Sequence, residues 1–206
     1  MKLVVVGGQA RKVGKTSVIS GLIQGLNRFA WTAVKISHHD DDVGWQDTPL
    51  ADDLPAQHDF LLSEERDAKG HGDTSVYLAA GARRALWLRA RGGSLVRALP
   101  GLLETLEGDE HVIMESNSIM AFLKPALYLL VLDESRDEFK ASARQFLERA
   151  DAFVTLKPDF RTRAWPGTSP QVFEGKPIFP VSAGERSNSA LCRFVCERLA
   201  SVREPV

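Results

Sequence analysis

Long apolar runs are missing from the 206-residue chain, and so is any excess of charge of one sign. No run approaches the roughly 18 apolar residues that a membrane-spanning helix requires. The formal net charge is -1, so the chain has no global basic field that would attract nucleic acid or an anionic membrane surface. We therefore expect neither nucleic acid nor a membrane as a partner, and any anion binding must be local.

Cysteine is also scarce, with only Cys192 and Cys196 in the whole chain. The two are four residues apart in a helical pattern, where a disulfide would have poor geometry. We expect two reduced thiols and hence a cytoplasmic protein. The first eight residues hold one lysine and a short apolar run that ends in glycines, which is typical of a buried strand and not of a signal peptide.

Apolar, β-rich runs alternate with helical patterns along the chain. Strands are predicted at 2–7, 32–37, 84–90, 111–116, 126–133, 152–157 and 177–182, and helices at 15–27, 94–108, 137–150 and 189–202. Continuous Val, Ile and Leu runs favour a parallel sheet with helices on both faces, which is the α/β class. We expect a single domain over residues 1–206, with an irregular and mobile acidic, histidine-containing segment at about 40–72.

The clearest motif follows the first predicted strand. Gly8 precedes Gly14-Lys15-Thr16, one residue further away than the usual G-x-x-x-x-G-K-[ST] spacing allows. A strand that runs through such a loop into a helix presents backbone N–H groups to phosphate oxygens. Lys15 would reach the β- and γ-phosphates, and the Thr16 hydroxyl would bind Mg²⁺. The predicted nucleotide-binding residues here are Gly8, Arg11, Lys12, Val13, Gly14, Lys15, Thr16 and Ser17.

Acidic residues follow two other predicted strands. Asp40, with Asp41 and Asp42 as alternatives, comes after the second strand, and Glu115 ends the strand at 111–116. Because open α/β sheets place ligands at the carboxyl ends of their strands, we expect Thr16, Glu115 and Asp40 around one Mg²⁺. Lys15, Glu115 and Asp40 are the predicted catalytic residues.

Two late segments bear on the choice of base. Lys157 and Asp159 form a K-x-D element after one strand, and Ser182-Ala183 follows the next. GTPases read guanine with similar elements, so GTP is favoured over ATP, although ATP stays open.

The phosphate loop "GGQARKVGKT" resembles that of dethiobiotin synthetase, which has the same extra residue. Three later stretches, "VKISHHDDD", "GDTSVYLAAGARRALWL" and "VIMES", resemble the molybdopterin-guanine dinucleotide biosynthesis protein B (MobB) family. Lys35, His38 and His39 fall on its second motif, Glu115 falls on its fourth, and the residues on its third are Asp73, Ala80, Gly81 and Ala82. The resemblance implies a three-layer P-loop NTPase fold. The chain departs from the family after Glu115, where Ser116-Asn117-Ser118 stands in place of Gly-Phe-Lys.

The resemblance also implies a function. It points to a Mg²⁺-dependent GTP-binding protein with slow hydrolysis, an accessory of molybdenum-cofactor biosynthesis that partners a nucleotidyltransferase and forms a homodimer. The alternatives are an ATP-dependent small-molecule ligase or kinase of the dethiobiotin-synthetase type, or a nucleotide-sensing module without significant turnover. Arginines flank the predicted strand at 84–90, and we expect Arg89 and Arg91 to be solvated unless they form a basic patch for a pterin phosphate or a second subunit.

Overall fold

The structure is a computed structural model, and it describes residues 1–39, 59–91, 93–157, 165–181 and 188–201. Its centre is an eight-stranded sheet in the order β3-β4-β2-β5-β1-β6-β7-β8. All neighbouring strands are parallel except the edge pair β3 and β4. The strands are β1 Lys2–Gly8, β2 Thr32–His39, β3 Phe60–Glu64, β4 Arg84–Arg91, β5 His111–Glu115, β6 Leu127–Leu132, β7 Ala152–Thr155 and β8 Ile178–Pro180.

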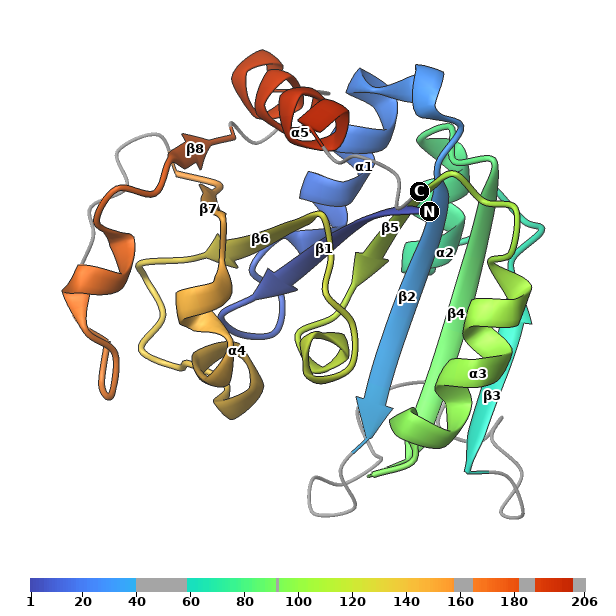
Figure 1. Ribbon diagram of the computed structural model, residues 1–206, viewed down its shortest axis with the longest axis horizontal. Coiled ribbons are helices and arrows are strands. Elements are labelled where there is room, and N and C mark those ends of the chain that lie inside the picture. Colours follow the sequence, from blue (N-terminus) through green and yellow to red (C-terminus); the bar gives the residue numbers. More distant parts are fainter. Residues whose placement is uncertain (40–58, 92, 158–164, 182–187, 202–206) are drawn as a thin grey trace.

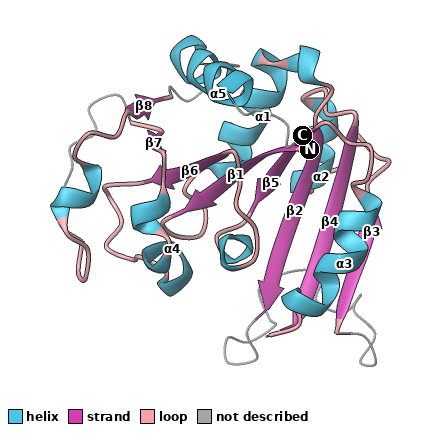
Figure 2. Ribbon diagram, in the orientation of Figure 1, coloured by secondary structure: helices cyan, strands magenta, loops and turns pink. Residues whose placement is uncertain are grey.

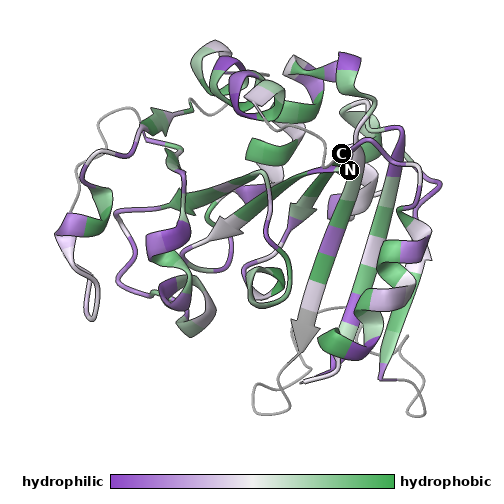
Figure 3. Cartoon of the chain, in the orientation of Figure 1, coloured by the Kyte–Doolittle hydropathy of each residue, from purple (hydrophilic) through white to green (hydrophobic). Residues whose placement is uncertain are grey.

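Helices cover both faces of this sheet, as the sequence predicts (Figures 1 and 2). They are α1 Lys15–Gly25, α2 Asp73–Ala79, α3 Leu95–Thr105, α4 Ala141–Gln145 and α5 Ser189–Ser201. One core lies between the sheet and α3 and α4. The other lies between the sheet and α1, α2 and α5. Figure 3 shows hydrophobic colouring along the interior strand β6, whereas β2 alternates between hydrophobic and polar residues.

The predicted strands and the helices predicted at 15–27, 94–108 and 189–202 are confirmed, with ends that differ by a few residues. Residues 40–58 of the segment expected to be irregular over 40–72 lie outside the described residues, and in its remaining part Phe60–Glu64 forms the antiparallel edge strand β3. Its Leu-Leu centre is too short to give a periodic signal. The helical pattern at 137–150 is broken into α4 and a 3₁₀ turn at Leu147–Arg149. Among the described residues, no helix is long and apolar enough to cross a membrane.

Strand β1 occupies the centre of the sheet, between β5 and β6. The chain builds one half of the sheet beyond β5 and the other beyond β6, so β1 lies where the strand order reverses. Ligands of open α/β sheets bind at such a point, outside the carboxyl ends of the strands. The loop that leaves β1 therefore starts at the position expected of a binding site.

The two halves of the sheet differ in length. Strand β5 ends at Glu115, which is paired with Lys35, whereas β2 and its neighbour β4 continue side by side as far as His39 and Arg91. Figure 1 shows β2, β4 and β3 projecting well beyond the end of β5. This projection leaves part of one sheet face next to the carboxyl end of β5.

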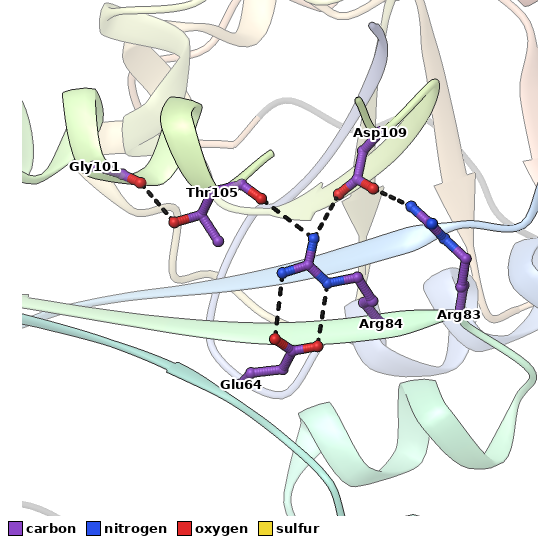
Figure 4. A network of polar contacts seen from close by, with 6 residues as sticks. All are labelled: Glu64, Arg83, Arg84, Gly101, Thr105 and Asp109. Carbon is purple, nitrogen blue, oxygen red and sulfur yellow. Dashed lines mark hydrogen bonds and ion pairs between the residues drawn. The ribbon is translucent and has the colours of Figure 1, made fainter. Parts of the chain in front are cut away.

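A polar network joins the opposite ends of these strands (Figure 4). The Asp109 carboxylate pairs with Arg83 and, at 3.2 Å, with Arg84. The Arg84 guanidinium also binds Glu64 through two hydrogen bonds of 3.1 and 3.2 Å and donates to the Thr105 carbonyl. The hydrogen bond from Arg84 lowers the pKa of Glu64. One guanidinium thus connects β3, β4 and the end of α3.

We predict that Asp109→Asn lowers the free energy of unfolding by about 1–3 kcal/mol, because the side chain is only 3% exposed and two arginines lose a charged partner. Urea denaturation measures the change. Glu64→Gln is the matched control, since its side chain is 43% exposed and such ion pairs contribute roughly 0–1 kcal/mol. Equal losses in the two variants would contradict a special role for Asp109.

Candidate active site at the phosphate loop

The loop between β1 and α1 is a tight turn with two residues in the left-handed region. These residues are Lys12, with φ 58°, and Gly14, with φ 93°. A side chain on Gly14 would also collide with Leu156, so this position requires glycine on two counts. Consecutive N–H groups in such a loop form a concave donor set for anions. The structure therefore gives the predicted loop a shape that suits phosphate.

Gln9 explains how the loop accommodates its extra residue. Its side chain is fully buried, accepts from the Asp133 N–H at 2.9 Å, and donates to the carbonyls of Arg136 and Glu138 at 3.0 Å each. Its own backbone carbonyl accepts from the Lys140 N–H at 2.8 Å. Through these hydrogen bonds, Gln9 connects the phosphate loop to residues 133–140, which follow β6.

Asn117 fixes the other side of the loop. Its amide accepts from the Gly8 N–H and donates to the Gly8 carbonyl, both at 2.9 Å. A side chain on Gly7 would collide with Asn117 and Tyr128. The departure from the resembled family after Glu115 thus has a structural role, since Asn117 pairs with the backbone at the point where β1 becomes the loop.

The predicted catalytic pair lies together at the carboxyl ends of β5 and β1. Lys15 Nζ lies 3.4 Å from Glu115 Oε1. Tyr77, on α2, donates a hydrogen bond to the other Glu115 oxygen. Burial, and then the adjacent Glu115 carboxylate, raise the pKa of Tyr77 well above its ordinary value, so the phenol keeps its proton. Glu115 is buried but paired on both oxygens.

Asp73 lies beside the Thr16 hydroxyl. Thr16 Oγ1 donates to Asp73 Oδ1 at 2.9 Å, and Lys35 forms an ion pair with Asp73 Oδ2. Burial lowers the pKa of Lys35, whereas the Glu115 carboxylate raises it. A hydroxyl and a carboxylate oxygen are ligands that Mg²⁺ prefers. Asp40 lies outside the described residues, so the acid that the structure places beside Thr16 is Asp73, at the start of α2.

The other predicted binding residues divide into two groups. Arg11, Lys12 and Ser17 are exposed around the loop, and Val13 is buried beneath it. Lys157 Nζ lies 3.7 Å from Asp133 Oδ1, and the preceding residue, Leu156, packs at Gly14. Asp159, Ser182 and Ala183 lie outside the described residues. Within the described ranges, no three His, Cys, Asp or Glu side chains gather as a metal cluster would require.

Lys140 is a cation of the site that sequence reasoning missed. It follows the segment held by Gln9, and its side chain is half-buried. Burial lowers the pKa of Lys140, and the positive charges of Lys15 and Arg11 lower it further. Three cations thus approach the phosphate loop from two segments that are about 125 residues apart in the sequence. The sequence around Lys140 shows only a helical pattern. Such a local pattern gives no information on the contact between Lys140 and the distant residue Gln9.

No protein-family model matches the chain, and no curated protein matches it. Solved structures do match in fold. HypB from Helicobacter pylori, in complex with nickel, has a TM-score of 0.54 and 16% identity over 96% of this chain and 86% of that one. LpxK from Aquifex aeolicus, in complex with ATP, has a TM-score of 0.50 and 17% identity over 86% of this chain. This chain spans about half of LpxK, 53% of its length.

At these identities the likeness establishes the fold and no membership of a narrower family. The predicted three-layer α/β arrangement of P-loop NTPases, a mostly parallel sheet with helices on both faces, is confirmed.

Gln9→Met tests the tie between the phosphate loop and residues 133–140. We expect the free energy of unfolding to fall by about 1–2 kcal/mol, because the part-buried Asp133 N–H and Glu138 carbonyl lose their partner. Gln24→Met, at an exposed position of α1, is the control. A loss no larger than that of the control, measured by chemical denaturation, would contradict the proposed tie.

Lys140 should take up a proton when a polyphosphate binds. An anion next to the Lys140 ammonium stabilises its charged form, so the lowered pKa returns toward the ordinary lysine value of about 10.4. Calorimetry at about pH 9, in buffers of different ionisation enthalpy, should therefore detect proton uptake on binding. Lys140→Met should reduce this uptake, and Lys124→Met, at an exposed position, should not. Equal uptake in both variants would remove Lys140 from the site.

Proposed function

We propose that the chain binds a nucleoside triphosphate with Mg²⁺ at the phosphate loop and hydrolyses it slowly. The observation that carries this proposal is the arrangement at the start of α1. Lys15 lies 3.4 Å from Glu115, and Thr16 lies 2.9 Å from Asp73. A cation that can bind phosphate, Lys15, thus lies beside a buried carboxylate, and the Thr16 hydroxyl lies beside a second carboxylate. Both pairs are at the N-terminus of α1, where the helix dipole also favours anions.

The catalytic contribution of this arrangement is electrostatic. The loop N–H groups and Lys15 stabilise the negative charge that develops on the transferred phosphoryl oxygens, and bound Mg²⁺ supplies a further positive charge. Thr16 and Asp73 would hold the metal, with Asp40 as the additional ligand expected from the sequence. Glu115 is the acid positioned to orient the attacking water. Tyr77 and Lys15 both bind its oxygens, so the position of the carboxylate is fixed from two sides.

We propose guanine as the preferred base. The support is positional, because Leu156 packs against Gly14 and so brings Lys157 to the phosphate loop. Val181, just before Ser182, is buried in the core that α1 also enters. The two segments that carry Lys157-x-Asp159 and Ser182-Ala183 therefore start beside the helix that binds the phosphates.

A role in molybdenum-cofactor biosynthesis, with a nucleotidyltransferase partner and a homodimeric state, is a narrower proposal. Its support is that Lys35, Asp73 and Glu115, which carry the resemblance to that family, form one cluster. The second candidate is an ATP-dependent small-molecule ligase or kinase of the dethiobiotin-synthetase type. The spacing of the phosphate loop favours it.

Calorimetry with non-hydrolysable GTP and ATP analogues tests the function. We expect Mg²⁺-dependent binding, with GTP at least tenfold tighter than ATP, a difference of about 1.4 kcal/mol. Lys15→Ala should abolish binding, and Thr16→Ala and Asp73→Asn should each remove most of the Mg²⁺ dependence. Lys124→Ala, at an exposed lysine, is the control.

The possible outcomes separate the proposals. Tighter binding of ATP would overturn the guanine assignment and favour the ligase or kinase. Binding that Asp73→Asn leaves equally dependent on Mg²⁺ would remove Asp73 from the metal site. If neither nucleotide binds, the proposed function is wrong.

A further inference from the structure

Polar side chains continue across the sheet from the phosphate site. In the register of the strands, Glu115 of β5 is paired with Lys35 of β2, Lys35 with Trp87 of β4, and Trp87 with Ser63 of β3. These four residues form one row perpendicular to the strands. Since neighbouring strands lie about 4.8 Å apart, the row extends roughly 14 Å from the predicted catalytic carboxylate to the edge of the sheet.

A second polar row lies two residues further along the strands. It pairs Ser37 of β2 with Arg89 of β4. Trp87 Nε1 donates to Ser37 Oγ at 2.9 Å, and the Arg89 guanidinium lies 4.4 Å from the centre of the Trp87 ring. The first row begins at the end of β5, and the second row lies on the part of β2 and β4 that continues beyond that end. We call the group formed by Lys35, Ser37, Ser63, Trp87 and Arg89 the polar platform.

The platform lies on the same side of the sheet as the phosphate loop. Alternate residues of these strands, such as Ile36 and Leu88, point into the core beneath α3. Ala33 and Ala85, on the platform side, pack in the core that contains α1 and α2. Helix α2 therefore covers this sheet face near the starts of β2 and β4. The platform lies on the same face, nearer the ends of these strands, and its Lys35 pairs with Asp73 at the start of α2.

Arg89 is the unusual member of the platform. The sequence leads us to expect a solvated arginine, but the residue is only 7% exposed. Among the residues that the structure describes, its Nε has no hydrogen-bond partner, and its contact with Ser63 is a long one of 3.5 Å. A buried guanidinium without an anion has a large desolvation cost. The arrangement fits an arginine that meets its anionic partner in a ligand.

We propose that the polar platform binds a second ligand, a small organic anion whose carboxylate or phosphate monoester is held by Arg89. From strand spacing, the Cα of Arg89 is about 12 Å from that of Glu115, so one small molecule can reach from Arg89 toward the phosphate site. The Trp87 ring offers an apolar surface, and Ser37 and Ser63 offer hydroxyls.

The inference deepens the proposed function, because it supplies a second ligand beside the triphosphate site. Calorimetry with phenyl phosphate and with benzoate, in the presence of Mg²⁺ and a saturating non-hydrolysable GTP analogue, tests it. We expect at least one probe to bind, and Arg89→Gln to weaken that binding at least tenfold while nucleotide affinity is unchanged. Arg193→Gln, an exposed arginine on α5, is the control. The two probes distinguish a phosphate from a carboxylate as the preferred anion.

Two further variants keep the test decisive. Ser63→Asp places a carboxylate within reach of Arg89, so it should block the probe even if Arg89→Gln fails to fold. Lys15→Ala without nucleotide should still bind the probe, so the platform can be tested whether or not the chain binds a triphosphate. Binding that Lys15→Ala abolishes and Arg89→Gln spares would locate the anion at the phosphate loop. That result, or the absence of binding of both probes to the unmodified chain, would overturn the proposal.

Discussion

Two lysines and two carboxylates share the space where the central strands end, and the geometry of the site depends on their mutual pairing. Lys15 pairs with Glu115, and Lys35 pairs with Asp73. Each of these groups would be costly to bury alone. The cluster joins the start of α1, the end of β5, the middle of β2 and the start of α2. Elements from four parts of the sequence are therefore held in register by charge as well as by packing.

The cluster also has consequences for ligand binding. A metal ion beside Asp73 would compete with Lys35 for the same carboxylate, and a triphosphate would compete with Glu115 for Lys15. This arrangement thus contains cations in the places where a bound triphosphate requires positive charge. Because the burial of Lys35 and Lys140 lowers their pKa values, additional negative charge at the loop would stabilise both ammonium groups.

Most of the fold could be predicted from the sequence because its signals are local. Runs of Val, Ile and Leu predict the buried parallel strands, and Gly14-Lys15-Thr16 identifies the loop that begins α1. Strand β3 was missed because its short edge position gives no strong periodicity. The roles of Gln9, Asn117 and Lys140 could not be predicted either, since each depends on a contact more than 100 residues away in sequence. A motif fixes residue types over a few positions, whereas these contacts depend on the strand order of the whole sheet.

The unequal lengths of the strands connect the fold to the proposed second ligand. In a sheet whose strands all ended with β5, the residues after Lys35 would lie in loops with no defined neighbours. Because β2, β4 and β3 continue together, Ser37 and Arg89 are held by backbone pairing at fixed spacing from Glu115. An arginine on a paired strand loses less conformational freedom on binding than one on a loop. A sheet face is usually a packing surface, but here the projecting strands hold the positive charge of Arg89 in a fixed position on that face.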